Sequence, residues 1–288
     1  MKRFSIVGAG RLGTSVGAAL ARRGWRPEAV VDRDARAARE GRRIIGAGRA
    51  STSPAAAAGA KGLVIVAVPD SRVGRAASAL ARASGSWAGR AVLHTSGSLP
   101  GSALAPLARR GASVASLHPV QAFPRKDMPA SIFRGVTWAV EGDAAAVEAA
   151  ARVVRALRGH ILLLSAANKP LYHAACALAS NALVALEWTA AGLLGRAGLD
   201  ERASVAALRP LLQGTLQNVN SLGLEKALTG PILRGDAATV KRHLEALRAA
   251  PEALEVYRVL GGRILGLAAQ GGLAKAKIRT LRRLLEGG

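Results

Sequence analysis

The sequence predicts an α/β N-terminal domain with a doubly wound, mostly parallel sheet, followed by an all-α C-terminal domain. Short apolar runs alternate with alanine-rich stretches in the first part of the chain, and the strand pattern stops after Ser165. Strands that alternate with helices at this spacing are typical of βαβ units. We therefore expect two domains, residues 1–165 and residues 166–288, without a long flexible linker between them.

The predicted strands of the first domain are runs of apolar and β-branched residues. The run at 63–68, Leu-Val-Ile-Val-Ala-Val, is continuous and apolar, as expected for a parallel strand buried on both faces. The other predicted strands lie at 3–8, 28–32, 91–94, 113–118, 135–141 and 160–164.

The predicted helices are placed by apolar periodicity and by capping residues. Those of the first domain lie at 11–23, 34–45, 70–83, 100–110 and 143–157. Those of the second domain lie at 168–197, 200–213, 217–228, 236–249, 251–269 and 273–286. Asp34, Asp200, Asp236 and Ser98 are predicted N-caps, and Pro251 is a predicted first helical residue.

The composition bears on the class of protein. The chain has 288 residues, of which 50% are hydrophobic, and a formal net charge of +23. Such a charge raises the hypothesis of nucleic-acid binding, but the arginines are spread over many helices and aromatic residues, which stack on bases, make up only 3%. We attribute the charge to a composition rich in Ala, Arg and Gly, and expect it to attract small anionic ligands.

We expect the protein to be cytoplasmic, because membrane-spanning and secretory features are not seen in the sequence. No apolar run reaches the ~18 to 20 residues that a membrane span needs. The N-terminal segment leads into a short strand and glycines, unlike a secretory signal. With Cys176 as the single cysteine, no intrachain disulfide can form, and with five scattered histidines no metal site is expected.

A glycine-rich turn follows the first predicted strand. Gly8, Gly10 and Gly13 have the G-x-G-x-x-G spacing that lets a backbone approach a pyrophosphate at the start of a helix. Asp32 ends the next strand about twenty residues further on, as in Rossmann domains that bind dinucleotides. The predicted turn consists of Gly8, Ala9, Gly10, Arg11, Leu12 and Gly13.

Two neighbouring residues bear on the choice of cofactor. Asp32 is suited to a ribose 2′-hydroxyl, which favours NAD, whereas Arg33 is suited to a 2′-phosphate, which favours NADP. We expect NADP(H) to be preferred, with NAD(H) possible. Further cofactor contacts are predicted where two strands end, at Val68, Pro69, Thr95 and Ser96.

Polar residues in the second domain form a candidate catalytic stripe. Lys169, His173, Cys176 and Ser180 lie on one side of the helix predicted over 168–197, with Asn181 at its edge. Polar groups on a packed helix cost free energy unless they are paired or used, although the first turns could simply face solvent. We therefore predict His173, Lys169 and Asn181 as catalytic residues.

Substrate contacts are predicted at three places. His118 ends a strand in the segment Ser-Leu-His-Pro-Val-Gln, and Ser180 belongs to the stripe. Arg234, on a loop shaped by Gly230, Pro231 and Gly235, could hold a carboxylate bidentately. A structural role for His118 is the alternative.

Together these motifs resemble a family of bacterial NADP oxidoreductases. The resemblance rests on the glycine turn and on the segments His-Pro-Val-Gln at 118–121, Tyr-His-Ala-Ala at 172–175, Ser-Asn at 180–181 and Gly-Pro-Ile-Leu-Arg-Gly-Asp at 230–236. It covers essentially the whole chain and implies a Rossmann-like domain followed by a helical domain of unassigned function. The resemblance also implies membership of the 6-phosphogluconate dehydrogenase C-terminal-like superfamily, with similarity to ketopantoate, pyrroline-5-carboxylate and prephenate reductases or dehydrogenases.

The resemblance implies further properties of the second domain. In the wider group, the helical domain usually dimerises and gives polar residues to the active site, several members using a helix lysine and a nearby asparagine. Lys169 and Asn181 are spaced more widely than that pair, and His173 is the candidate to replace the lysine.

These motifs and the resemblance therefore favour an NAD(P)-dependent oxidoreductase that acts on a small anionic keto-acid or imine, with ketopantoate as the first substrate to test. It favours a homodimer formed through the helical domain, without a membrane or nucleic-acid partner. A non-catalytic dinucleotide-binding sensor is the main alternative, and a nucleic-acid binder is the second.

Overall fold

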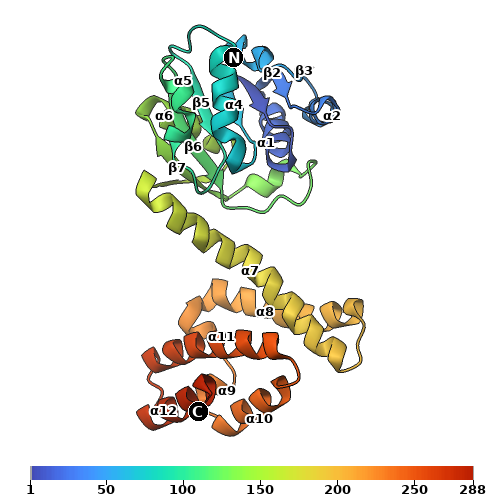
Figure 1. Ribbon diagram of the computed structural model, residues 1–288, viewed down its shortest axis with the longest axis vertical. Coiled ribbons are helices and arrows are strands. Elements are labelled where there is room, and N and C mark those ends of the chain that lie inside the picture. The colour runs from blue at the N-terminus through green and yellow to red at the C-terminus, as the bar shows by residue number, and fades with distance from the viewer. Residues whose placement is uncertain (1, 288) are drawn as a thin grey trace. The chain divides into compact units, whose positions relative to one another are not determined.

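The computed structural model describes residues 2–287 and confirms the predicted fold class (Figure 1). Eight strands form one sheet in the order β3-β2-β1-β4-β5-β6-β7-β8. All neighbours are parallel except β6 and β7, which are antiparallel. The strands are β1 (Arg3–Val7), β2 (Arg26–Val31), β3 (Arg49–Ser51), β4 (Leu63–Val66), β5 (Ala91–His94), β6 (Ser113–Pro119), β7 (Thr137–Gly142) and β8 (His160–Leu163).

Helices cover both faces of this sheet, and each face has its own apolar core. One core joins the sheet to α1 (Arg11–Arg22), α2 (Ala35–Ile45) and α6 (Ala144–Leu157). The other joins it to α3 (Ala55–Ala58), α4 (Asp70–Arg82), η1 (Gly101–Leu104) and α5 (Ala105–Ala108). The short helix η2 (Ala130–Phe133) precedes β7. The short edge strand β3 was not predicted, because three residues carry too little periodicity to be recognised.

After β8 the chain is helical. Two predicted helices, at 200–213 and 217–228, prove to be one element, α8, which breaks only at Gly223, where φ is +79°. The motif at 230–236 contains a short helix where a loop was predicted. The helices are η3 (Ala166–Asn168), α7 (Lys169–Arg196), α8 (Glu201–Ala227), α9 (Pro231–Arg234), α10 (Ala237–Leu247), α11 (Pro251–Gln270) and α12 (Lys275–Glu286).

The chain divides into two compact units between Ser180 and Asn181, inside α7. The strands end at Leu163, close to the predicted boundary at residue 165, but the first turns of α7 belong to the sheet-containing unit. The predicted domain limits therefore stay a prediction.

Most predicted capping residues take that role. The side chains of Asp34, Asp200 and Asp236 accept hydrogen bonds from the first turns of α2, α8 and α10, and Pro251 begins α11. The prediction that Ser98 caps a helix is wrong. The helix that follows begins only after Pro100, too far along the chain for Ser98 to cap it. The Ser98 hydroxyl instead donates a hydrogen bond to Asp70.

Helix α7 is rich in apolar residues and largely exposed. The stretch Ala166–Arg196 is long and apolar enough to cross a membrane. Its most apolar 18-residue window has a mean hydropathy of 1.3, and 6% of that window is buried. The sequence analysis expected no run of that length. By itself this is weak evidence for a membrane span, because length and composition alone do not distinguish such a span from a helix that packs against protein.

Candidate functional site

Two of the three motif glycines are required by the packing of the fold itself. Gly8 has a φ of +103°, and a side chain there would overlap the carbonyl group of Ala67. A side chain at Gly13 would overlap the carbonyl oxygen of Gly8. These two positions therefore bring β1, the loop after β4 and α1 into close contact.

Gly10 differs from the other two glycines. A Cβ built there meets no atom of the described residues within 4 Å. Gly10 is also the N-cap of α1, and no side chain caps this helix within residues 2–287. The first N–H groups of α1 are therefore available to an anion, and the space over Gly10 admits a ligand.

A cavity of about 490 Å³ opens at this turn, which is a typical size for a small-molecule site. Among the predicted cofactor contacts, those that line the cavity are Gly8, Gly10, Asp32, Arg33, Val68 and Pro69. The sequence analysis missed Arg72 and Arg75, which also line it from α4. Their spacing of three residues places both on one side of that helix.

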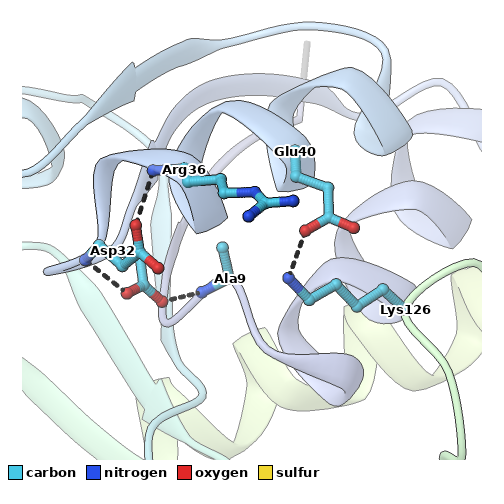
Figure 2. A network of polar contacts seen from close by, with 6 residues as sticks. Ala9, Asp32, Arg36, Glu40 and Lys126 are labelled. Carbon is cyan, nitrogen blue, oxygen red and sulfur yellow. Dashed lines mark hydrogen bonds and ion pairs between the residues drawn. The ribbon is translucent and has the colours of Figure 1, made fainter.

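Asp32 ties the glycine turn to the end of β2. One carboxylate oxygen accepts a hydrogen bond from the Ala9 N–H at 2.8 Å, and the other accepts one from the Asp34 N–H at 3.0 Å (Figure 2). Each oxygen keeps a further lone pair, so the predicted ribose contact is compatible with this structural role. Arg33 follows directly and is exposed.

The loop that follows β6 is fastened to α1 and α2. The Lys126 ammonium donates to Glu40 of α2 at 2.8 Å, and this hydrogen bond lowers the pKa of Glu40 (Figure 2). The Ser15 hydroxyl of α1 donates to the carbonyl oxygen of Lys126 at 3.0 Å. These contacts fix the segment that follows His118 against the helix of the glycine turn.

A row of polar side chains crosses the sheet from β5 to β7. In the strand register, His94 is paired with Ser116, and Ser116 is paired with Glu141. Directly paired residues project from the same face of a sheet. Glu141 accepts a hydrogen bond from the Gly101 N–H, at the start of η1. Ser116 is fully buried, and alternation along β6 places His118 on the same face, one step closer to the strand's end.

Lys169, the first residue of α7, completes this row. Its side chain is fully buried, and its amine donates to the Ser116 hydroxyl and, at 3.4 Å, to the carbonyl oxygen of Ser96. Burial lowers the pKa of Lys169, although Glu141 and Asp70 oppose the shift. Solvent exposure of Lys169, the alternative considered in the sequence analysis, is therefore wrong.

His94 has a structural role. The Ser96 N–H donates to its Nδ1 at 3.1 Å, so Nε2 carries the hydrogen and lies 2.9 Å from the acceptor oxygen of Pro100. Burial lowers the pKa of His94 to about 4, which keeps the ring neutral. With both nitrogens occupied, His94 is not available to a substrate.

Three aromatic side chains meet where β6 ends and α7 begins. His118 Nδ1 lies 2.7 Å from the Tyr172 hydroxyl, and the His118 ring meets the His173 ring edge to face at 5.7 Å. A side chain at Gly97 would overlap His173 and crowd His118. The structure thus brings together the predicted residues His118, Lys169 and His173, and adds Tyr172 and Gly97, which the sequence analysis did not select.

Among the other predicted residues, Ser96 contributes the carbonyl oxygen that accepts from Lys169. Thr95 and Ser96 are buried in the loop after β5, where the Ser96 hydroxyl accepts hydrogen bonds from Ser98 and Leu99. Ser180 and Asn181 are exposed along α7, and Arg234 is exposed at the end of α9. Their roles stay predictions. Among residues 2–287, no cluster of three or more His, Cys, Asp or Glu is placed to hold a metal ion.

Comparison with protein families assigns both parts of the chain. Residues 2–119 match a Rossmann-like domain, and residues 136–264 match a domain of unknown function, DUF2520. The chain therefore combines a region that matches a Rossmann-like domain with one that matches DUF2520. This confirms the domain combination that the resemblance implied. No curated protein matches the chain.

Solved structures share the fold of this chain at low sequence identity. A candidate NADP oxidoreductase from Bacteroides fragilis has 22% identity and a TM-score of 0.75, over 92% of this chain and 98% of that one. A reductive aminase from Aspergillus terreus, in complex with NADPH and ethyl levulinate, has 22% identity and a TM-score of 0.63, over 98% of each chain. Arogenate dehydrogenase from Synechocystis has 18% identity and a TM-score of 0.53, over 99% and 96%.

The contact between Lys169 and Ser116 gives the first testable prediction. Ser116→Ala should lower the free energy of unfolding by about 1–3 kcal/mol, because it leaves the buried amine with one acceptor fewer. In the Lys169→Met background the same change should cost much less. Urea unfolding of the four proteins of this cycle measures the coupling. Equal costs in both backgrounds would show that the hydroxyl is not needed by the lysine.

Proposed function

We propose that the chain is an NAD(P)-dependent oxidoreductase that transfers hydride between NADPH and a small anionic keto-acid or imine. The observation that carries this proposal is the shared location of the cavity and the polar cluster. Both lie at the carboxyl ends of parallel strands of one sheet, where doubly wound folds bind their ligands. Structural relatives whose names include NADPH or NADP support the proposal.

The residues of the glycine turn fit a dinucleotide. The uncapped start of α1 would hold the pyrophosphate over Gly10, and Arg33 would hold a 2′-phosphate. Arg72 and Arg75 add positive charge to the same cavity, which favours NADP(H) over NAD(H). When bound, the reduced nicotinamide supplies the hydride, and the protein supplies orientation and a proton.

His173 is the proposed proton donor. Hydride addition to a carbonyl or imine carbon leaves negative charge on the oxygen or nitrogen, which must be protonated. The His173 side chain is partly exposed, whereas the Lys169 side chain is fully buried. Lys169 therefore acts as a helper, through its positive field. Asn181 stays a proposed catalytic residue. Ser180 and Arg234 stay proposed contacts of the anionic substrate, for which ketopantoate is the first candidate.

Cofactor binding tests the first half of the proposal. Isothermal titration should show tighter binding of NADPH than of NADH, and Arg33→Ala should remove about 1–2 kcal/mol of that preference, the scale of a hydrogen bond to a charged group. Gly10→Ala should weaken binding of both nucleotides without changing the melting temperature, because its Cβ enters open space. NADH preferred by the unmodified protein would contradict the assignment.

Turnover tests the second half. NADPH oxidation is followed with ketopantoate, other keto-acids and cyclic imines, first with the unmodified protein. His173→Gln should lower kcat by about a hundredfold, the usual size of general-acid catalysis, with NADPH affinity unchanged. Nucleotide binding without turnover of any substrate would favour the sensor hypothesis. Normal turnover of both His173→Gln and Lys169→Met would show that the cluster is structural.

We also propose that the chain forms a cytoplasmic homodimer through its helical region. Helices α7 and α8 expose many large apolar side chains, between 69% and 75% accessible at Leu171, Leu178, Val184, Trp188, Leu211 and Leu224. Monomeric proteins rarely leave so much apolar surface uncovered. A second copy is the favoured occupant, because an identical pair of apolar helices provides a surface of the same character.

Light scattering tests this assembly. The unmodified protein should have twice the mass of one chain at micromolar concentration, and Leu178→Arg should shift it toward the monomer, because a charge is then buried in the interface. Ala145→Arg, on the exposed side of α6, adds the same charge outside these helices and should leave the mass unchanged. A monomeric unmodified protein would contradict the proposal.

A further inference from the structure

The hydroxyl of Tyr172 and the ring of His118 form a short contact at the end of β6. The distance from the hydroxyl to Nδ1 is 2.7 Å, and the two rings meet edge to face with centroids 5.6 Å apart. Tyr172 lies on the second turn of α7, three residues after the buried Lys169. Both partners are thus held by regular structure, His118 by the sheet and Tyr172 by the helix.

The His118 ring is neutral near physiological pH. Burial, followed by the electrostatic effects of His173 and Lys169, lowers its pKa to about 4 against an opposing effect of Asp70. A neutral imidazole carries one hydrogen, on either Nδ1 or Nε2. The hydrogen bond made by one nitrogen decides which nitrogen carries it.

The Tyr172 hydroxyl is suited to be the donor in this pair. Burial, and next Cys176, raise the pKa of Tyr172, so the phenol keeps its hydrogen. His118 Nδ1 lies 2.7 Å from the hydroxyl, and the other side chain that affects it is Cys176. A thiol sulfur is a weak acceptor, whereas a neutral imidazole nitrogen is a strong one. The phenol hydrogen therefore belongs on the bond to Nδ1, and the ring hydrogen on Nε2.

The Nε2 edge of the His118 ring lies beside Gly97, which has no side chain. The nearest neighbours of a Cβ built on Gly97 include His118 Nε2 at 3.0 Å and the His173 ring. Among residues 2–287 the His118 ring makes no hydrogen bond other than that to Tyr172. The Nε2 hydrogen thus lies beside the proposed proton donor and lacks a protein acceptor.

We propose that Tyr172 is a positioning residue that holds His118 as its Nε2–H tautomer, so that His118 presents a neutral N–H donor to the reacting oxygen or nitrogen of the substrate. The role toward a substrate rests on the proposed function. The N–H bond stays intact: it polarises the carbonyl or imine during hydride addition, and the proton that completes the reaction comes from His173.

Nitrogen-15 NMR of the protein without ligands tests the tautomer. The His118 signals, assigned by their loss in His118→Gln, should show a protonated Nε2 and an unprotonated Nδ1 at neutral pH. In Tyr172→Phe the two shifts should move toward each other, because the tautomers then exchange. A protonated Nδ1 in the unmodified protein, or unchanged His118 shifts in Tyr172→Phe, would overturn the inference.

Kinetics test the role toward a substrate. Tyr172→Phe should lower kcat by about tenfold, the lower end of the effect of residues that orient an active group, with NADPH affinity unchanged. The control is Tyr257→Phe. Tyr257 contacts His243 Nδ1 at 2.9 Å with the rings edge to face, and loss of this hydroxyl should leave kcat unchanged.

Two substitutions of His118 sharpen the test. Gln can place an amide N–H near the position of Nε2, whereas the shorter Asn places it near Nδ1. We expect His118→Gln to keep more activity than His118→Asn, and the reverse order would count against the inference. If the unmodified protein reduces no substrate but shows the Nε2–H tautomer, the proposed function is wrong and with it the role toward a substrate. A protonated Nδ1 together with normal turnover overturns only the inference.

Discussion

The buried amine of Lys169 is the constraint on which the arrangement of the polar cluster depends. An ammonium group without solvent must find acceptors inside the protein, or its burial costs several kcal/mol. Here the acceptors are the Ser116 hydroxyl on β6 and a carbonyl oxygen in the loop after β5. The first turn of α7 is therefore held at one place on the sheet, and Tyr172 and His173 follow one turn later, beside the end of β6.

The same amine shapes the chemistry of its neighbours. Burial disfavours protonation of His118 and the lysine adds to this effect, so this ring offers a neutral N–H and not a cation. A negative charge that develops on a substrate beside these rings would be stabilised by the lysine without direct contact. Burial thus makes Lys169 unsuited to touch a substrate and suited to set the potential in which His118 and His173 act.

The sequence was sufficient to predict the fold class because its signals are local. Apolar runs, Asp caps and the glycine spacing each depend on residues a few positions apart, and they located every strand of the sheet except β3. The joining of two predicted helices into α8 was missed because Gly and polar residues near 214–218 are typical of a break, whereas the structure breaks only at Gly223.

The candidate site could be predicted only in part, because its contacts join distant segments. The resemblance and the helical stripe selected Lys169 and His173, and a strand end selected His118. Ser116 was missed, although alternation along β6 places it on the same face as His118, because a serine within an apolar strand gives no signal of its partner. Tyr172 was missed because its contact with His118 spans 54 residues.

The glycines show why a motif needs a structure before it can be interpreted. Gly8, Gly10 and Gly13 count equally in the spacing, yet a side chain at Gly8 or Gly13 overlaps the protein itself, whereas one at Gly10 meets open space. A glycine that internal packing requires is evidence for the fold and not for a bound ligand. Gly10 has no such requirement, and its place at the uncapped start of α1 is where a ligand phosphate would lie. The evidence for a ligand therefore comes from the one glycine that the fold does not need.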